Sequence, residues 1–368
     1  MFEKVFSYKF YRSTETAWDA MHESITNATR SIFWELYIFV DDAAGMRFVD
    51  TLAEKAKQGV EVKLIVDALG SSKFSESSRR RLIAAGAKVV WYNRIYQDLR
   101  FWQWITRLLN RNHRKVLIID EEVAFLGGVN VKEDFRSWDD IFIRLTGRIA
   151  KPLLRGFARS YIASGGSRTD VKRLLHHNLE EALPEWREKI RFILHSPSGA
   201  KLPKTKLFYL KAFAIAKERI NLLTPYYVPD PIFLRALALA SSRGVKINIF
   251  IPYRTDLQLM ELLARTYFEA TIKAGASIFL LNKMNHGKAL SVDGSLGLVG
   301  SINLMPRSFS RQEESAVSFK DPQMVAELNS MFEELKAGAE ELNMEKWRRR
   351  PLRQRFSEWL AKKLEYFV

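Results

Sequence analysis

Two short stretches of the chain carry the same side chains, and those side chains could act together on a phosphate group. The stretches are residues 112–120 and 285–293. Each holds an asparagine, a histidine, a lysine two residues after the histidine and an aspartate five residues after the lysine, within a run typical of a buried strand. Because side chains alternate along a strand, each histidine and its lysine face the same side. These positions form our candidate catalytic set: His113, Lys115, Asp120, His286, Lys288 and Asp293.

The two aspartates of this set have a second interpretation as turn residues. Each is an odd number of residues from its histidine and its lysine, so a regular strand would point it to the opposite face. Asp293 is followed by Gly294 and then by a second apolar run, and Asp120 stands in the equivalent place, which is a hairpin signal. We therefore expect Asp120 and Asp293 to act in turns or behind the reacting groups, while both remain in the candidate set.

An asparagine follows each motif at the same interval from the histidine. Asn130 and Asn303 stand on the returning strands, each just after a pair of small residues. A lysine ammonium and an asparagine amide on neighbouring strands are suited to binding the non-bridging oxygens of a phosphate. We therefore predict phosphate-binding roles for Asn130 and Asn303.

The duplication makes a two-step displacement at phosphorus possible. One imidazole can attack the phosphorus in line while the other protonates the leaving oxygen, and the second group can then deprotonate an incoming alcohol or water. This chemistry needs no metal or cofactor, and we expect none. The two histidines must differ in pKa, which nearby carboxylates can arrange. Asp140 and Glu314 follow the two histidines at comparable intervals, and we expect them to orient the imidazoles.

The elements around the motifs are repeated as well. Strands alternate with amphipathic helices in each half, which predicts βαβ units and an α/β fold with a mostly parallel sheet per half. Matching glycines, Gly59 with Gly244 and Gly86 with Gly275, mark the same helix ends. We predict a first repeat over residues 1–164, a linker over 165–200, a second repeat over 201–342 and a basic amphipathic C-terminal helix over 343–368.

The composition limits the kinds of partner. The chain has 368 residues, 47% of them apolar, which is enough for two domains with separate cores. It has no cysteine, which excludes disulfides, thiolate catalysis and cysteine-bound metals. We see no signal peptide, and the most apolar window, residues 32–40, is too short to span a bilayer. The net charge of +16 calls for a polyanionic partner, either nucleic acid or an anionic membrane surface.

Two segments favour a membrane over nucleic acid. In the first half, an extra segment rich in aromatic and basic residues precedes the motif and has no counterpart in the second half. Residues 101–109 of this segment could cover the site and favour an alcohol over water as acceptor. After Pro351, a helix would gather large apolar side chains on one side, as in a helix that lies in a membrane interface. These side chains are Leu352, Phe356, Trp359, Leu360, Leu364 and Phe367. The alternative is a helix packed on the protein with a solvated basic face.

The repeated motif and its surroundings resemble the phospholipase D superfamily, whose signature is a duplicated His-x-Lys motif. The similarity is greatest to the bacterial cardiolipin synthases of the short type, which lack N-terminal membrane helices. It includes residues 300–304 (Gly-Ser-Ile-Asn-Leu), Arg307 with Ser308, and residues 224–230 (Thr-Pro-Tyr-Tyr-Val-Pro-Asp). One departure is Met305, where the family usually has an acidic residue.

The resemblance implies two phospholipase D-like α/β/α domains with the active site at their interface. His113 would form a phosphohistidine, His286 would be the general acid and base, and the lysines and asparagines would bind phosphate. The implied activity is that of a cardiolipin synthase-like phosphatidyltransferase, which moves a phosphatidyl group from a phospholipid to phosphatidylglycerol. The donor would be phosphatidylglycerol or phosphatidylethanolamine, and the protein would lie peripherally on the cytoplasmic side of the cell membrane.

Two other interpretations stay open at the level of sequence. A phospholipase D-type hydrolase or a nuclease would use the same catalytic groups, although the aromatic and basic segments argue against nucleic acid. A non-catalytic membrane-binding scaffold would keep the fold, but both motifs are complete in this chain.

Overall fold

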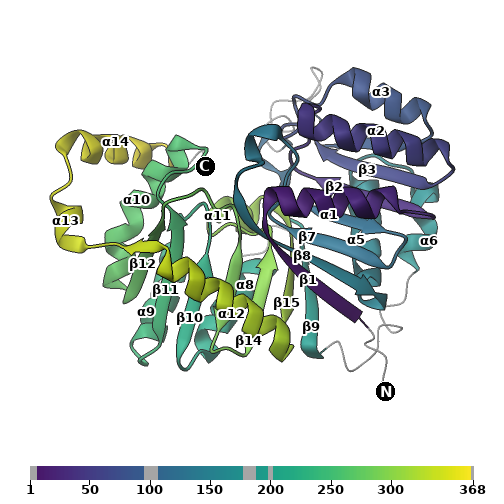
Figure 1. The fold of residues 1–368 in the computed structure, drawn as a ribbon. Coiled ribbons are helices and arrows are strands. Elements are labelled where there is room, and N and C mark those ends of the chain that lie inside the picture. Colours follow the sequence, from purple (N-terminus) through teal and green to yellow (C-terminus); the bar gives the residue numbers. More distant parts are fainter. Residues whose placement is uncertain (1–5, 95–106, 177–187, 198–201, 366–368) are drawn as a thin grey trace.

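The computed structural model describes residues 6–94, 107–176, 188–197 and 202–365. Within them the chain forms two α/β domains that lie side by side, one from each half of the sequence (Figure 1). Each domain is built on a β-sheet with helices packed on both faces. The predicted duplication is therefore confirmed at the level of architecture.

The first domain contains a seven-stranded sheet in the order β1-β8-β7-β6-β2-β3-β4. Its strands are β1 (Phe6–Ser13), β2 (Ser31–Leu36), β3 (Glu61–Asp67), β4 (Lys88–Tyr92), β6 (Val116–Ile119), β7 (Val123–Gly127) and β8 (Asp139–Gly147). Helices α1 (Thr14–Thr26), α2 (Ala43–Lys57) and α3 (Glu76–Ala84) pack on one face. Helices α5 (Lys151–Ala163) and α6 (Lys172–Leu175) pack on the other.

The second domain contains a nine-stranded sheet in the order β16-β12-β11-β10-β13-β14-β15-β5, with β9 also paired to β15. Its strands are β5 (Arg111–Asn112), β9 (Ile190–His195), β10 (Arg219–Leu223), β11 (Lys246–Pro252), β12 (Ala276–Leu281), β13 (Ala289–Val292), β14 (Leu296–Gly300), β15 (Gln312–Phe319) and β16 (Ala339–Glu341). Its helices are α8 (Lys204–Ile215), α9 (Pro231–Ser241), α10 (Gln258–Lys273), α11 (Pro306–Ser310), α12 (Pro322–Ala337), α13 (Met344–Arg348) and α14 (Leu352–Lys363).

The direction of the strands corrects one expectation, because the sheets are mixed and not mostly parallel. Parallel pairing joins β2 to β3 and β3 to β4 in the first domain, and β10 to β11 and β11 to β12 in the second. The motif strands β6 and β13 pair antiparallel on both sides. The reason lies in the connections. Tight turns follow the motif strands, and a tight turn can join only antiparallel neighbours, whereas the parallel strands are joined by helices.

Two short segments that precede the second repeat in the sequence pair with the sheet of the second domain. Strand β5 stands directly before His113 and pairs parallel with β15, and β9, which lies within the predicted linker, pairs antiparallel with the same strand. In the reverse direction, a bridge joins Asn285, which stands directly before His286, to Asp139 at the start of β8. Each motif histidine is therefore attached to a strand of the opposite domain.

One apolar core runs through both domains and fixes them against each other. It contains side chains of α5 and of the inner face of the first sheet together with side chains of β14, β15 and α12. Phe10 of β1 and Phe319 of β15 lie in contact there, with ring centroids 5.9 Å apart. Because these side chains are closely packed on both sides of the boundary, they fix the relative position of the residues that each domain contributes to the site.

Matching local signals end and begin the helices of the two halves. Gly59 and Gly244 both have φ near +87°, a conformation that favours glycine, and stand just after α2 and α9. Asp42 and Asp230 cap the N-termini of the same helices by accepting backbone N–H groups. Among the described residues, no helix is long and apolar enough to cross a bilayer.

Candidate active site

His113 is positioned by strand β5 and held by a carboxylate of the second domain. Its backbone N–H donates to the carbonyl of Glu313 at 2.9 Å, which continues the pairing of β5 with β15. Both carboxyl oxygens of the next residue, Glu314, lie 3.1 Å from Nδ1 of His113. Glu314 also accepts a hydrogen bond from the hydroxyl of Ser301. With Nδ1 occupied in this way, Nε2 is the ring nitrogen that remains for chemistry.

His286 is positioned by the equivalent contacts with the roles of the two domains exchanged. Its backbone N–H donates to the carbonyl of Asp139 at 2.7 Å, and its Nδ1 lies 3.1 Å from Oδ2 of Asp140. The Asp140 carboxylate rests against the backbone of Gly128, where an added Cβ would lie only 2.5 Å from Oδ1. The absence of a side chain at Gly128, two residues before Asn130, therefore leaves room for this carboxylate.

The carboxylates are exchanged between the halves of the chain. Asp140 follows His113 in sequence but contacts His286, and Glu314 follows His286 but contacts His113. Within one sheet, β7 separates β8 from the motif strand β6, which places them two strand spacings or roughly 10 Å apart. A carboxylate at the start of β8 cannot span that gap, whereas the histidine of the other domain lies beside it.

The two motif lysines are buried close to the histidines. Lys115 and Lys288 are at most 1% exposed, and each ammonium donates to the carbonyl of the histidine in its own motif, at 2.7 Å for Lys115. Burial lowers the pKa of Lys288 to about 8. Burial and, secondly, the charge of Lys288 hold the pKa of Lys115 well below its usual value. Two ammonium groups in a buried site repel each other, so the site is electrostatically prepared for an anion.

The surroundings of the two histidines keep both imidazoles neutral, to different extents. Burial lowers the pKa of His113 well below its usual value, and the charge of Lys115 adds to that effect. Burial and Lys288 also lower the pKa of His286, but its bond to Asp140 opposes them. His286 is itself one of the groups that depress the pKa of His113, so the two imidazoles lie within electrostatic range of each other.

The two candidate phosphate-binding asparagines lie buried behind the small residues, at 5% and 2% exposure. The amide oxygen of Asn130 accepts a hydrogen bond from the backbone N–H of Ile38 at 3.1 Å, so a phosphate would be bound by its NH₂ group. The amide oxygen of Asn303 has no hydrogen-bond partner among the described residues.

Aromatic rings form walls beside each histidine. The ring of Tyr37 meets that of His113 edge-on at 5.0 Å, and the ring of Tyr226 meets that of His286 at 6.3 Å. Trp138 adds a third ring, 5.7 Å from His286. Trp138 belongs to no repeated motif, so the sequence offered no signal for it apart from its position two residues before Asp140.

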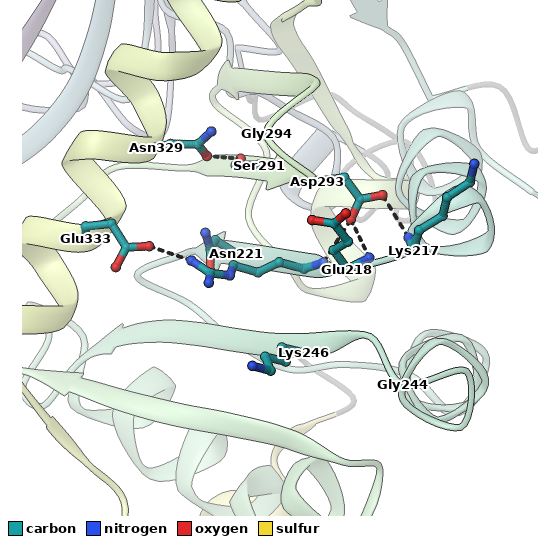
Figure 2. Close-up of a pocket in the computed structure, with 11 residues that line it drawn as sticks. Lys217, Glu218, Asn221, Gly244, Lys246, Ser291, Asp293, Gly294, Asn329 and Glu333 are labelled. Atoms are coloured by element: carbon teal, nitrogen blue, oxygen red, sulfur yellow. Dashed lines mark hydrogen bonds and ion pairs between the residues drawn. The ribbon is translucent and has the colours of Figure 1, made fainter.

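The motif aspartates lie at the opposite ends of the motif strands. Asp120 follows β6 whereas His113 precedes it, a separation of roughly 20 Å along an extended chain. Asp120 accepts backbone N–H groups of residues 29–31. Asp293 does the same with residues 217–219, beside a pocket of about 560 Å³ (Figure 2). Both have φ near +50°, as turn residues do. The candidate catalytic set is thus divided, with both aspartates placed in turns.

A buried ionic network behind His113 was not anticipated from the sequence. Arg114 donates to the hydroxyl of Ser160 at 2.6 Å and to the carbonyl of His195 at 2.7 Å, and it lies 3.1 Å from the Glu313 carboxylate. Burial raises the pKa of the neighbouring Glu35 to about 7, against the opposing charge of Arg114. An available signal was a glutamate inside the apolar strand 31–36, because a charge in such a place needs a partner.

The fold and the site together define a class of protein. Two α/β domains, each with one His-x-Lys motif, converge on one buried site that holds two histidines and two lysines, which is the arrangement of a phospholipase D-like protein. The chain belongs to the family described as "Cardiolipin synthase, PLD-like domain", which matches residues 21–159 and 209–336.

Similar proteins carry names that agree with this family. A cardiolipin synthase of Clostridium perfringens is 32% identical over 318 residues, which make up 83% of this chain and 65% of that protein. The chain thus spans just under two thirds of the length of that relative. The minor cardiolipin synthase ClsB of Bacillus subtilis is 29% identical over 360 residues, 95% of this chain and 86% of that protein.

A solved structure has the same fold. The crystal structure of a phosphatidylserine synthase of Haemophilus influenzae superposes with a TM-score of 0.74 and covers 98% of this chain and 93% of its own. The sequence identity is 15%, so this likeness concerns the fold alone.

Proposed function

We propose that this protein is a phosphatidyltransferase of the cardiolipin synthase type, which moves a phosphatidyl group to phosphatidylglycerol through a phosphohistidine. The observation that carries the proposal is the pair of buried imidazoles, each held at Nδ1 by a carboxylate of the other domain. Two such imidazoles beside two buried lysines suit in-line transfer of a phosphodiester, in which one ring attacks and the other moves a proton. The names of the similar proteins support the same activity.

His113 is the proposed nucleophile because its surroundings favour the neutral ring most. Its pKa is the more strongly depressed of the two, so the neutral, nucleophilic form of the ring is favoured. His286 keeps more of its basicity through Asp140, which suits a group that must hold a proton and later take one. The arriving phosphodiester anion offsets the repulsion of the lysines and favours the protonated form of His286.

The proposed reaction has two displacements at the same phosphorus. In the first, Nε2 of His113 forms a bond to phosphorus, the bond to the head-group oxygen breaks, and His286 gives that oxygen its proton. In the second, a hydroxyl of phosphatidylglycerol loses its proton to His286 and attacks phosphorus, and the bond to His113 breaks. Both steps develop negative charge on the non-bridging oxygens, which Lys115 and Lys288 can stabilise in their buried surroundings.

The asparagines complete the proposed phosphate site. The NH₂ groups of Asn130 and Asn303 would donate to the same non-bridging oxygens, one from each domain. The proposed substrates are membrane phospholipids, with phosphatidylglycerol as acceptor and phosphatidylglycerol or phosphatidylethanolamine as donor. The net charge of +16 favours binding to an anionic membrane surface. We place that surface on the cytoplasmic side, because the cytoplasmic leaflet carries the anionic lipids.

The test uses purified protein and phosphatidylglycerol vesicles, with lipid mass spectrometry before and after incubation. The expected products are cardiolipin and glycerol in equal amounts, and a His113→Ala variant with an unchanged melting temperature should yield neither. Phosphatidic acid as the sole product would assign the protein to the hydrolases. No turnover of phosphatidylglycerol, with or without phosphatidylethanolamine, would contradict the proposal and lead to tests on nucleic acid and on lipid binding without catalysis.

A further inference from the structure

Helix α14 presents its large apolar side chains to solvent and not to the protein. The exposed fractions are 77% for Leu352, 62% for Phe356, 55% for Trp359, 50% for Leu360 and 43% for Leu364, which follows the last helical residue. The rings of Phe356 and Trp359 are stacked on each other, with centroids 5.8 Å apart. An exposed apolar face of this size on one short helix marks an interaction surface.

The side of α14 that is attached to the protein is not its apolar side. The residues of α14 buried against the protein are Glu358 and Ala361, at 2% and 3% exposure. Glu358 pairs with Arg350 at 2.7 Å and accepts a hydrogen bond from Gln354 at 3.0 Å. With about 100° between successive helical residues, the buried strip and the apolar face lie on nearly opposite sides of the helix. The attachment of the helix and its exposed surface are therefore separate.

The charges around the apolar face favour an anionic bilayer as its partner. Arg353, Arg355, Lys362 and Lys363 are all exposed on the same helix. The ammonium of Lys363 lies 5.5 Å from the centroid of the Trp359 ring, so a cation stands directly beside the apolar side chains. Such residues place a charged end at lipid head groups while their stems cover apolar surface. A second copy of the same face would bring like charges together.

The attachment of α14 also connects it to the second histidine through one intervening aromatic ring. Ala361 packs in one buried cluster with Tyr226, Met305 and Met260, and the ring of Tyr226 is the one that meets His286. Figure 1 shows α14 at the outer edge of the second domain, beyond α10. The cluster also gives a reason for Met305, where the family resemblance leads one to expect an acidic residue. At 5% exposure beneath the helix, an acid there would be buried among apolar side chains.

We propose that α14 is an interfacial helix, whose apolar face enters the boundary between head groups and acyl chains of an anionic bilayer and sets the mouth of the active site at that surface. A phospholipid could then reach His286 and His113 without its acyl chains crossing water. The direction of substrate entry rests on the proposed function, whereas binding of α14 to a bilayer does not.

The absence of cysteine from the chain allows a direct test on the full-length protein. A Phe356→Cys variant carries one environment-sensitive fluorophore, and Ile232→Cys on α9, where the parent side chain is 55% exposed, carries it as the matched control. Vesicles of phosphatidylglycerol should shift the emission at residue 356 to the blue, vesicles of phosphatidylcholine should shift it much less, and residue 232 should not respond. Equal responses at both positions, or none at residue 356, would overturn the proposal. A shift at residue 356 that grows with protein concentration without vesicles would do so as well, because it would indicate a second copy.

A second test separates docking from catalysis. The double variant Phe356→Glu with Trp359→Glu should bind phosphatidylglycerol vesicles at least about tenfold more weakly, because two large apolar contacts become charges. The matched variant Ile232→Glu with Leu239→Glu should bind as the parent does. Both should keep the parent's turnover of a short-chain phospholipid dissolved below its micellar concentration. Unchanged vesicle binding by the first variant would refute the role of α14. A parent protein that binds vesicles through α14 but turns over neither lipid would contradict the proposed function and leave the docking result standing.

Discussion

The Glu314 carboxyl group lies in surroundings that favour its protonated form. It is fully buried, and burial raises its pKa from 4.5 to about 8, ahead of the opposing effect of Lys115. A group whose pKa is raised by folding binds more protons in the folded state. Its contribution to stability is therefore complete below about pH 4.5 and is lost as the pH rises through about 8.

We predict that Glu314→Gln flattens the dependence of stability on pH between about 4.5 and 8. In the parent, the free energy of unfolding should fall more steeply with rising pH than in the variant, because ionisation of Glu314 stabilises the unfolded state. Urea unfolding at a series of pH values measures the slope. Glu333→Gln, at an exposed glutamate of α12, is the control and should keep the parental slope. An identical slope in the Glu314→Gln variant would show that this carboxyl group does not titrate as described.

The motif aspartates should matter for stability and not for the reaction. Each carboxylate accepts three backbone N–H groups at the start of a neighbouring strand. Asp120→Asn or Asp293→Asn weakens these bonds and should lower the free energy of unfolding by about 1–3 kcal/mol, with turnover of phosphatidylglycerol nearly unchanged. Urea unfolding and the lipid assay measure the two effects. A loss of turnover in a variant that stays folded would place the aspartates in the catalytic machinery after all.

At the scale of elements, strand β5 and the residues after it join the first domain to the second. Asp67 and Arg111, both fully buried, form an ion pair at 2.6 Å before the motif. Arg114, inside the motif, reaches α5, β9 and β15. The second motif has Gly287 at the corresponding place and makes no such connection through a side chain. The two histidines are therefore equivalent in position, but only the first is held by a buried arginine beside it.

We predict that Arg114→Ala lowers the free energy of unfolding by about 3–5 kcal/mol, because it leaves the Glu313 carboxylate buried without its cation. Arg114→Lys keeps the charge but not the forked geometry of the guanidinium, and its loss of unfolding free energy should be smaller. Guanidinium unfolding followed by circular dichroism measures both. A loss in Arg114→Ala no larger than that of an exposed arginine, such as Arg12→Ala, would mean that the network contributes little to the stability of the fold.

At the scale of the whole molecule, the site exists only because the domains exchange their carboxylates. The side chain that holds His113 is 201 residues away in sequence, and the one that holds His286 is 146 residues away. Neither domain by itself contains a histidine together with its partner. Packing of the shared core sets the distance between them, so the stability of the interface and the geometry of the site depend on the same contacts.

This exchange predicts opposite kinetic defects for two similar substitutions. Asp140→Asn should impair proton transfer by His286 and let the phosphohistidine on His113 accumulate. Glu314→Gln should instead impair the formation of the phosphohistidine. Each should lower transfer by up to about 10⁴-fold, as the loss of a residue that orients a catalytic histidine can do. Quenched reactions with phosphorus-labelled donor lipid measure the intermediate. The reverse pattern would mean that each carboxylate serves the histidine of its own half.

The sequence by itself predicted the duplication and brought each histidine together with the lysine of its motif, whereas Asp120 and Asp293 of the candidate set lie in turns away from the histidines. Alternation along a strand puts each histidine and lysine on one face, and the Asp-Gly turn after the second motif predicts a hairpin, because these are local properties of the backbone. It also placed the apolar side chains of α14 on one side of a helix. Residues 101–106 of the segment expected to cover the site lie outside the described residues, so that expectation stays a prediction.

Only the tertiary structure decided which carboxylate holds which histidine, which direction the sheet strands run, and which side of α14 faces outward. Sequence intervals cannot show these features, because two repeats with the same spacing permit pairing within a half as well as between halves. The choice follows from packing. Strand β7 keeps β8 away from the motif strand of its own sheet, and the shared core brings β15 beside His113 and β8 beside His286. Burial by both domains then lowers the pKa of both histidines, and the bond of His286 to Asp140 opposes this effect and makes the two unequal.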